Sequence, residues 1–226
     1  MYIVYFAVLL LLPLYAQRKG MKTYKRYAEV RSTSGMTGAE VARTILDSNG
    51  LSNVRVVETP GVLSDHYDPR SKTVALSSQN YHNASVAGTS VAAHECGHAI
   101  QHKEAYAFLT LRSKLVPAAN ISSNLSWIFI MIGMLSSSMR SLMLIGIILL
   151  AIGVLFQIVT LPVEFDASKR ALNQVVSLGI IRNEEESHAR KVLSAAALTY
   201  VAAAATAVME LARLLLIYTG LNNNED

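Results

Sequence analysis

The chain has 226 residues, of which 52% are hydrophobic and 16% charged, and its mean hydropathy is +0.33. This composition is too apolar for an ordinary soluble domain and too charged for a chain that lies entirely in lipid, so we expect one part in the membrane and another in water. The net charge of +4 does not indicate nucleic-acid binding, because the basic residues border hydrophobic segments, where lipid headgroups and membrane topology account for them.

The first predicted element is a hydrophobic span over residues 2–16, bordered by tyrosines that suit a membrane interface. A cleavable signal peptide is the competing interpretation. The charge order argues against it, because no Lys or Arg precedes the apolar run and several follow it from Arg18 onward. We therefore expect an uncleaved anchor with its N-terminus outside.

An aqueous α+β region follows the anchor. Residues 37–50 are predicted to be a helix, because Thr37 and Glu40 form a capping box and an Asn-Gly pair ends the segment. Residues 53–58 are typical of a strand, and residues 61–77 of a hairpin that turns at a proline.

Residues 91–102, VAAHECGHAIQH, place three histidines and one glutamate in a stretch that is otherwise small and apolar. The stretch favours a buried helix, in which His94 and His98 lie one turn apart on one face, with Glu95 beside His94. This is the H-E-x-x-H pattern, in which the two imidazoles bind zinc and the glutamate handles the proton of a water. A metal would also supply the partner that these buried polar groups need.

Zinc needs a third protein ligand, with a fourth position open if the site is catalytic. His102 lies about 12 Å along the helix axis from His94, too far for one ion with bonds of about 2 Å, so it is either a hydrogen-bonding neighbour or an ordinary interfacial histidine. Gln101 and Glu104 stand where the longer metzincin signature has Gly and His, which excludes that signature. The third ligand must come from far along the chain.

Two more spans, residues 121–135 and 142–161, flank a short polar connector and predict a transmembrane hairpin. A fourth stretch, residues 192–218, is long enough to span but carries Glu210 and Arg213, which lie one turn apart and can pair. We expect it to span, with a buried or interfacial helix as the alternative.

Charge bias predicts the topology, because Lys and Arg concentrate on the cytoplasmic side of short loops. The segment after the first span and residues 169–191 are both basic, which places them and the H-E-x-x-H helix in the cytoplasm. The lone Cys96 excludes an intrachain disulfide and agrees with a reducing compartment. Because Cys96 lies off the stripe of His94 and His98, we expect it to pack rather than to bind metal.

A carboxylate follows the third span. Pro162 suits the first turn of a new helix, in which Glu164 and Ser168 share a face and Asp166 lies about 200° around the axis. Glu164 is the predicted third ligand and Asp166 the main rival, and a solvated acid at a helix start is the alternative for either. Three histidines remain further candidates: His66, His82 and His188.

The segments AAHECGHAIQH and PVEFDASKRA, with paired spans between them, resemble the membrane zinc metallopeptidases of the YugP type over nearly the whole chain. More distantly the chain looks like the HtpX and CAAX prenyl protease zincins, which bind zinc through two motif histidines and a downstream Glu in an E-x-x-x-D pattern. The resemblance implies that His94, His98 and Glu164 bind zinc and that Glu95 is the general base.

Ser168 departs from the wider group, which has Asp at this position to support a ligand histidine. Ser168 or Asp166 is left for that role. The zincin resemblance also implies that the strand before the zinc helix, residues 72–77, aligns a peptide substrate through its backbone, and a merely structural strand is the alternative.

We therefore expect a mainly α integral membrane protein with a small α+β zincin-like cytoplasmic part, built from an H-E-x-x-H helix, a strand or hairpin before it and three to four transmembrane helices. The expected domains are an N-terminal transmembrane anchor (1–16), a cytoplasmic zincin-like region (17–116), a transmembrane hairpin (117–163), a cytoplasmic segment with the third ligand (164–191) and a C-terminal helix that spans the membrane (192–226).

The predicted activity is peptide-bond hydrolysis with one zinc ion per chain, acting on a peptide or membrane-protein substrate, with the lipid bilayer as a partner and no nucleic acid. The alternative is a non-catalytic membrane binding protein with a structural zinc site, which requires a fourth protein ligand. A transporter would need polar residues facing one another within the spans, and the spans offer few. No oligomeric state follows from the sequence, and no spacing argument selects an oxyanion donor among His188, Arg190 and Tyr200.

Overall fold

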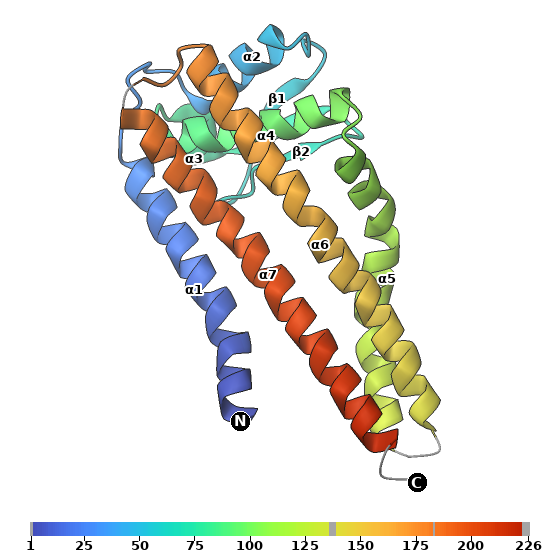
Figure 1. Ribbon diagram of the computed structural model, residues 1–226. Helices are drawn as coiled ribbons and strands as arrows, with labels where there is room; N and C mark the ends of the chain where they lie inside the picture. The colour runs from blue at the N-terminus through green and yellow to red at the C-terminus, as the bar shows by residue number, and fades with distance from the viewer. Residues whose placement is uncertain (1, 136–138, 183, 223–226) are drawn as a thin grey trace. The chain divides into compact units, whose positions relative to one another are not determined.

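The computed structural model describes residues 2–135, 139–182 and 184–222 as a mainly helical chain with one small sheet (Figure 1). Two compact units are present. The helical unit comprises the described parts of Met1–Leu14, Thr110–Leu161 and Tyr200–Asp226, and the mixed unit those of Tyr15–Leu109 and Pro162–Thr199. The elements in chain order are α1 (Tyr2–Ala28), α2 (Gly38–Ser48), β1 (Arg55–Thr59), β2 (His66–Asp68), β3 (Thr73–Ser77), α3 (Ser78–His82), α4 (Val86–Lys103), α5 (Ala107–Leu135), α6 (Arg140–Ser177) and α7 (Glu184–Asn222).

Among the described residues, four helices are long and apolar enough to cross a membrane: α1, α5, α6 and α7. Each contains one of the four hydrophobic stretches expected from the sequence, so the mainly helical architecture with four candidate spans and a small sheet is confirmed. The helices extend beyond the apolar stretches, because polar residues that favour helix continue the same hydrogen-bonding pattern. The connector expected at residues 136–141 lies partly outside the described residues.

The expected helix start at Pro162 is wrong. Pro162 lies inside α6, which runs without a break from Arg140 to Ser177. A proline removes one backbone hydrogen bond, but its fixed φ is helical, so a helix stabilised on both sides can continue through it. The apolar stretch and Glu164 therefore belong to one helix.

The helical unit has its own apolar core, formed by Ile130, Met143, Ile147 and Leu214. In this unit Arg213 donates to Glu210 at 3.0 Å, which confirms the pair expected from their spacing. The Tyr5 hydroxyl also donates to Glu210, at 2.9 Å, so the pair joins α1 to α7 within the helical unit.

In the mixed unit, α2 has the predicted N-terminal cap. The Thr37 side chain accepts from the Glu40 amide at 3.3 Å, and the Glu40 carboxylate accepts from the Thr37 amide at 2.8 Å. The helix is followed by Gly50, whose φ of +66° suits a residue without a side chain. Both predicted ends of this helix are confirmed.

The sheet has the order β1-β3-β2. β2 and β3 form the predicted antiparallel hairpin, and β1 pairs with β3 in parallel. β3 is therefore the central strand, and both of its edges are occupied. Thr73–Ala75 share their backbone groups with a strand on each side, which favours the structural alternative for residues 72–77.

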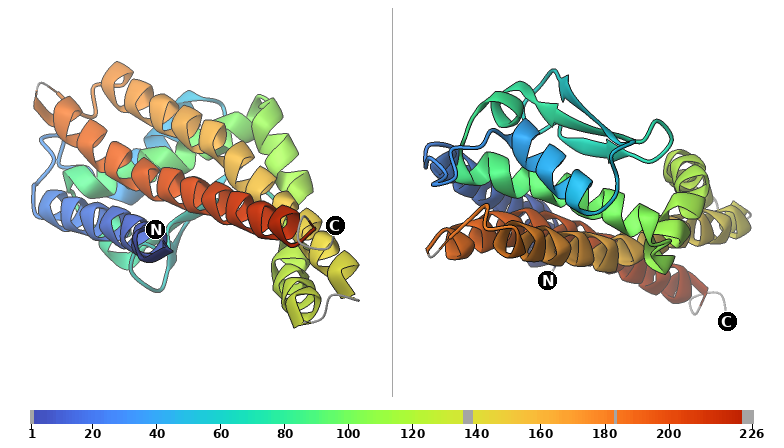
Figure 2. Two further views of the ribbon diagram at one scale, coloured as in Figure 1. Left: turned by 60° about the horizontal axis from the view of Figure 1, so that its bottom comes forward. Right: turned by 90° about the horizontal axis from the view of Figure 1, so that it is seen from above.

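Helix α4 is the central layer of the mixed unit. Figure 2 shows α2 and the sheet on one side of α4, and the mixed-unit parts of α6 and α7 on the other. One buried apolar core joins these layers, with Ile45 from α2, Leu76 from β3, Cys96 from α4, Val175 from α6 and Leu193 from α7. This core fixes the position of α4.

α4 and α6 touch through their backbones. A Cβ atom added at Gly97 would lie 2.5 Å from the carbonyl oxygen of Ala167. Contacts this short are not tolerated, so only glycine permits the observed approach of the two helices.

We expect Gly97→Val to destabilise the protein by roughly 1–3 kcal/mol, because the new side chain must push α6 away from α4. Gly153→Val is the matched control, since Gly153 is also a helical glycine but has no heavy atom within 4 Å of the added Cβ. Thermal unfolding in detergent, followed by circular dichroism, measures both. An equal midpoint for the two variants would show that the close contact is not required.

Candidate metal centre

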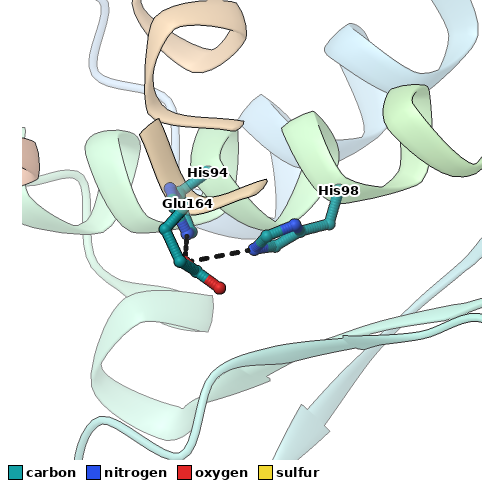
Figure 3. A group of neighbouring side chains, drawn as sticks. All are labelled: His94, His98 and Glu164. Carbon is teal, nitrogen blue, oxygen red and sulfur yellow. Dashed lines mark hydrogen bonds and ion pairs between the residues drawn. The ribbon is translucent and has the colours of Figure 1, made fainter. Parts of the chain in front are cut away.

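Three predicted ligands converge in the mixed unit. His94 and His98 lie one turn apart on α4, and their ring centroids are 4.7 Å apart. Glu164 reaches them from α6, with its Oε2 atom 3.2 Å from His94 Nε2 and 3.6 Å from His98 Nε2 (Figure 3). The nitrogen and oxygen atoms thus point at a common centre.

The spacing of these donor atoms fits a zinc ion. All three lie within 4.8 Å of one another. In a tetrahedral site with bonds of about 2.0–2.1 Å, neighbouring donors lie about 3.3 Å apart, close to the two distances to Glu164. Two imidazoles and one carboxylate are also a donor set that zinc accepts, so the residues fit the metal.

The three side chains are largely buried, and the charge of Glu164 affects the pKa of His98. Glu164 is only 2% exposed, and an unpaired carboxylate there would be costly. Burial by itself lowers the pKa of His98, but its hydrogen bond with Glu164 and the negative charges of Glu95 and Glu164 outweigh burial, so the pKa of His98 is raised. The cluster therefore favours positive charge at the point where the three side chains meet, which is the condition that a divalent cation satisfies.

The second nitrogen of each imidazole is also held. His94 Nδ1 lies 3.2 Å from the Ser168 hydroxyl, and His98 Nδ1 lies 3.0 Å from the Gln101 Oε1 atom. When Nδ1 donates in these bonds, Nε2 keeps its lone pair toward the centre, which is the tautomer that a metal ligand requires. Ser168, one of the two residues left open for this role, is thus the one that contacts His94.

Gln101 connects His98 to α6. It is fully buried, and its Nε2 atom donates to the Val163 carbonyl oxygen and to Asp166, each at 2.8 Å. Asp166 in turn accepts from Arg170. Asp166, the main rival for the third ligand, is therefore occupied away from the cluster. Sequence reasoning missed the role of Gln101, although its position three residues after His98 on one helix was a usable signal.

The other motif residues take separate positions. Glu95 is 8% exposed, follows His94 directly on α4, and lies near enough for its charge to raise the pKa of His98. Cys96 packs in the apolar core instead, where burial raises the pKa of its thiol. This agrees with the expectation that Cys96 packs.

The remaining candidates stand outside the three-residue cluster in the described part of the chain. His102 Nδ1 is hydrogen-bonded to the Tyr67 hydroxyl at 2.9 Å, which makes it a polar link between α4 and β2. The other three histidines contact groups outside the cluster, which are Ser64 for His66, Glu58 for His82 and the Tyr27 ring for His188. Of the suggested oxyanion donors, Arg190 pairs with Glu186, and Tyr200 belongs to the helical unit.

Comparison with known proteins agrees with this arrangement. Residues 2–219 match the family described as "Putative neutral zinc metallopeptidase". The chain is also 48% identical over 215 residues to "Putative membrane protease YugP" of Bacillus subtilis (strain 168), a match that covers 95% of this chain and 94% of that protein. No solved structure gives a significant match. Since the family match extends over nearly the whole chain, the protein belongs to this family of zinc metallopeptidases, as its resemblance to the YugP type indicated.

Proposed function

We propose that the chain is a membrane zinc metalloendopeptidase that binds one zinc ion per chain through His94, His98 and Glu164. The supporting observation is the convergence of these three donor atoms, with no fourth His, Cys, Asp or Glu joining them among the described residues. Catalytic zinc sites have three protein ligands and an open position, whereas structural sites fill all four. The geometry therefore favours an enzyme over a structural zinc clamp.

Zinc, when bound, supplies a Lewis acid for the scissile carbonyl group and lowers the pKa of a water to about 7. Glu95 is the general base in this proposal. Its carboxylate accepts a proton from the attacking water and delivers it to the nitrogen of the departing amine. Ser168 and Gln101 keep the two imidazoles oriented, so that no reorientation is needed when a substrate binds.

The substrate in this proposal is a peptide or a membrane protein. β2, and not β3, is the strand that can align it, because β2 lies at an edge of the described sheet and Tyr67 connects it to α4. An extended peptide can add to such an edge through backbone hydrogen bonds.

We place the metal centre on the cytoplasmic side of the membrane. The basic residues that follow the apolar part of α1 support this placement, since Lys and Arg are enriched at cytoplasmic helix ends. The free thiol of Cys96 is consistent with a reducing compartment.

Glu95→Gln should retain stoichiometric zinc and lose proteolytic activity by about 100-fold or more, because the amide cannot accept the proton. Zinc is measured by plasma mass spectrometry of the purified protein, and activity by cleavage of casein. Glu29→Gln is the control, since Glu29 is exposed and not part of the cluster. Unchanged casein cleavage by the Glu95 variant would refute the proposed mechanism.

Glu164→Ala and Asp166→Asn distinguish the third ligand from its rival. Loss of Glu164 should abolish stoichiometric zinc, because it removes one of the three protein ligands that a catalytic zinc site needs. Asp166→Asn should retain zinc with an affinity lowered by about 10–100-fold, since Asp166 acts through Gln101. Circular dichroism checks that both variants fold. The reverse pattern of zinc loss would assign the ligand role to Asp166.

Substitutions at Ser168 test the support of His94. Ser168→Ala should weaken zinc binding by about 10-fold or more, because it removes the acceptor for Nδ1, whereas Ser168→Asp should keep the affinity, because a carboxylate also accepts this proton. Competition with a chromophoric chelator measures the zinc dissociation constant. Equal affinities in the alanine and aspartate variants would show that Ser168 does not orient His94.

A further inference from the structure

A second site lies in the mixed unit, where α1 and α7 run side by side (Figures 1 and 2). It is a pocket of ≈ 430 Å³, a volume typical of pockets for small ligands. Nothing in the proposed proteolysis uses it. Its lining combines five cations with two hydroxyl groups, one tyrosine and one alanine: Lys19, Lys22, Arg26, Arg190, Lys191, Thr23, Ser194, Tyr27 and Ala195.

The cations from α1 belong to one face of the helix. Lys19, Lys22 and Arg26 follow the spacing i, i+3, i+7, which keeps their side chains on one stripe. Arg18 and Lys25, on the same stretch of α1, lie about 100° around the axis and do not line the pocket. Only some of the basic residues of α1 therefore line the pocket.

The wall of the pocket is packed against the rest of the unit. A Cβ atom at Gly20 would lie 3.5 Å from the Ala195 carbonyl oxygen, so the two helices are in contact here. The Tyr27 ring is buried, with its centroid 4.9 Å from that of His188 and 5.6 Å from the Arg26 guanidinium carbon. The cations thus extend from helices that are packed against each other.

Few ion pairs compensate these cations within the described residues. Residues 2–28 contain no Asp or Glu. Arg190 pairs with Glu186 at 2.9 Å. Neither Lys22 nor Lys191 has an ion pair within residues 2–135, 139–182 and 184–222. The pocket is therefore positively charged and open to an anion, which would find lysine ammonium groups and hydroxyl donors together.

The pocket lies beside the apolar parts of both helices along the chain. On α1, Lys19 comes three residues after the apolar stretch 2–16, and on α7, Ala195 is at the beginning of the apolar stretch 192–218. One helical turn is about 5.4 Å, so these cations would stand at the level of the lipid headgroups when the helices span a membrane.

We propose that this pocket binds the phosphate group of an anionic phospholipid. Ammonium and guanidinium groups bind phosphate through charge-assisted hydrogen bonds, and basic pockets between membrane helices bind anionic headgroups. A free phosphate ester shares this chemistry, but the apolar segments that adjoin the pocket along the chain offer a place for acyl chains that a soluble ester does not need.

The test uses the full chain in neutral detergent, titrated with phosphatidylglycerol or phosphatidylcholine, with bound lipid counted by native mass spectrometry. K22Q/K191Q removes two pocket cations, and R18Q/K25Q removes two cations of α1 that do not line the pocket. All four side chains are exposed, so both variants should unfold at the wild-type temperature. We expect the pocket variant to bind phosphatidylglycerol at least about 10-fold more weakly and the control variant to stay within about twofold of wild type.

Equal weakening in both variants would overturn the proposal, because it would show that the cations act only through general surface charge. Equal affinity of the wild type for phosphatidylglycerol and phosphatidylcholine would overturn it as well. A separate titration uses sn-glycerol 3-phosphate, which should bind far more weakly than the lipid. If this ester binds in the pocket and the pocket variant keeps its lipid affinity, the phospholipid assignment is wrong.

Discussion

The close approach of α4 and α6 is the constraint on which the metal centre depends. Gly97 presents no side chain to the carbonyl oxygen of Ala167, so the two backbones meet. Gly97 precedes His98 directly, and Glu164 lies one turn before Ala167 on α6. The contact that requires glycine therefore also sets the distance between the carboxylate and the two imidazoles. A larger residue at this position would disturb packing and donor geometry together.

Several polar groups around the centre are hydrogen-bonded to one another. A buried polar atom without a partner costs about 1–3 kcal/mol, and a buried charge costs more. Gln101 avoids this cost by bonding at both ends of its amide, to His98 on one side and to Val163 and Asp166 on the other. The same bonds fix the orientation of His98. Stability and ligand geometry are thus provided by the same interactions.

Because the long helices are continuous, charged residues follow apolar ones closely along the chain. Glu164 follows the apolar stretch 142–161 by three residues on one unbroken helix, and Lys19 follows the apolar stretch 2–16 by three residues on another. Each helix changes from apolar side chains to charged ones within about one turn. Under both proposals, the metal centre and the anion pocket follow membrane-spanning segments along the chain without an intervening loop.

Local signals predicted much of the secondary structure. The capping box at Thr37, the turn of the hairpin and the apolar stretches each depend on neighbours within a few residues, and all of them are found in the structure. The H-E-x-x-H spacing likewise needs only helical geometry to place His94 and His98 on one face. The helix start expected at Pro162 failed because tertiary packing on both sides outweighs one missing hydrogen bond.

The sequence by itself determined the residue types, the helical spacing of the two imidazoles and the apolar segments, because these follow from contacts close in the chain. Only the tertiary structure decided that Glu164 and not Asp166 meets the imidazoles, that Gln101 joins His98 to α6, and that β3 is a central strand. It also decided which cations of α1 face α7. These outcomes depend on how helices and strands far apart in sequence pack, and no local spacing encodes that.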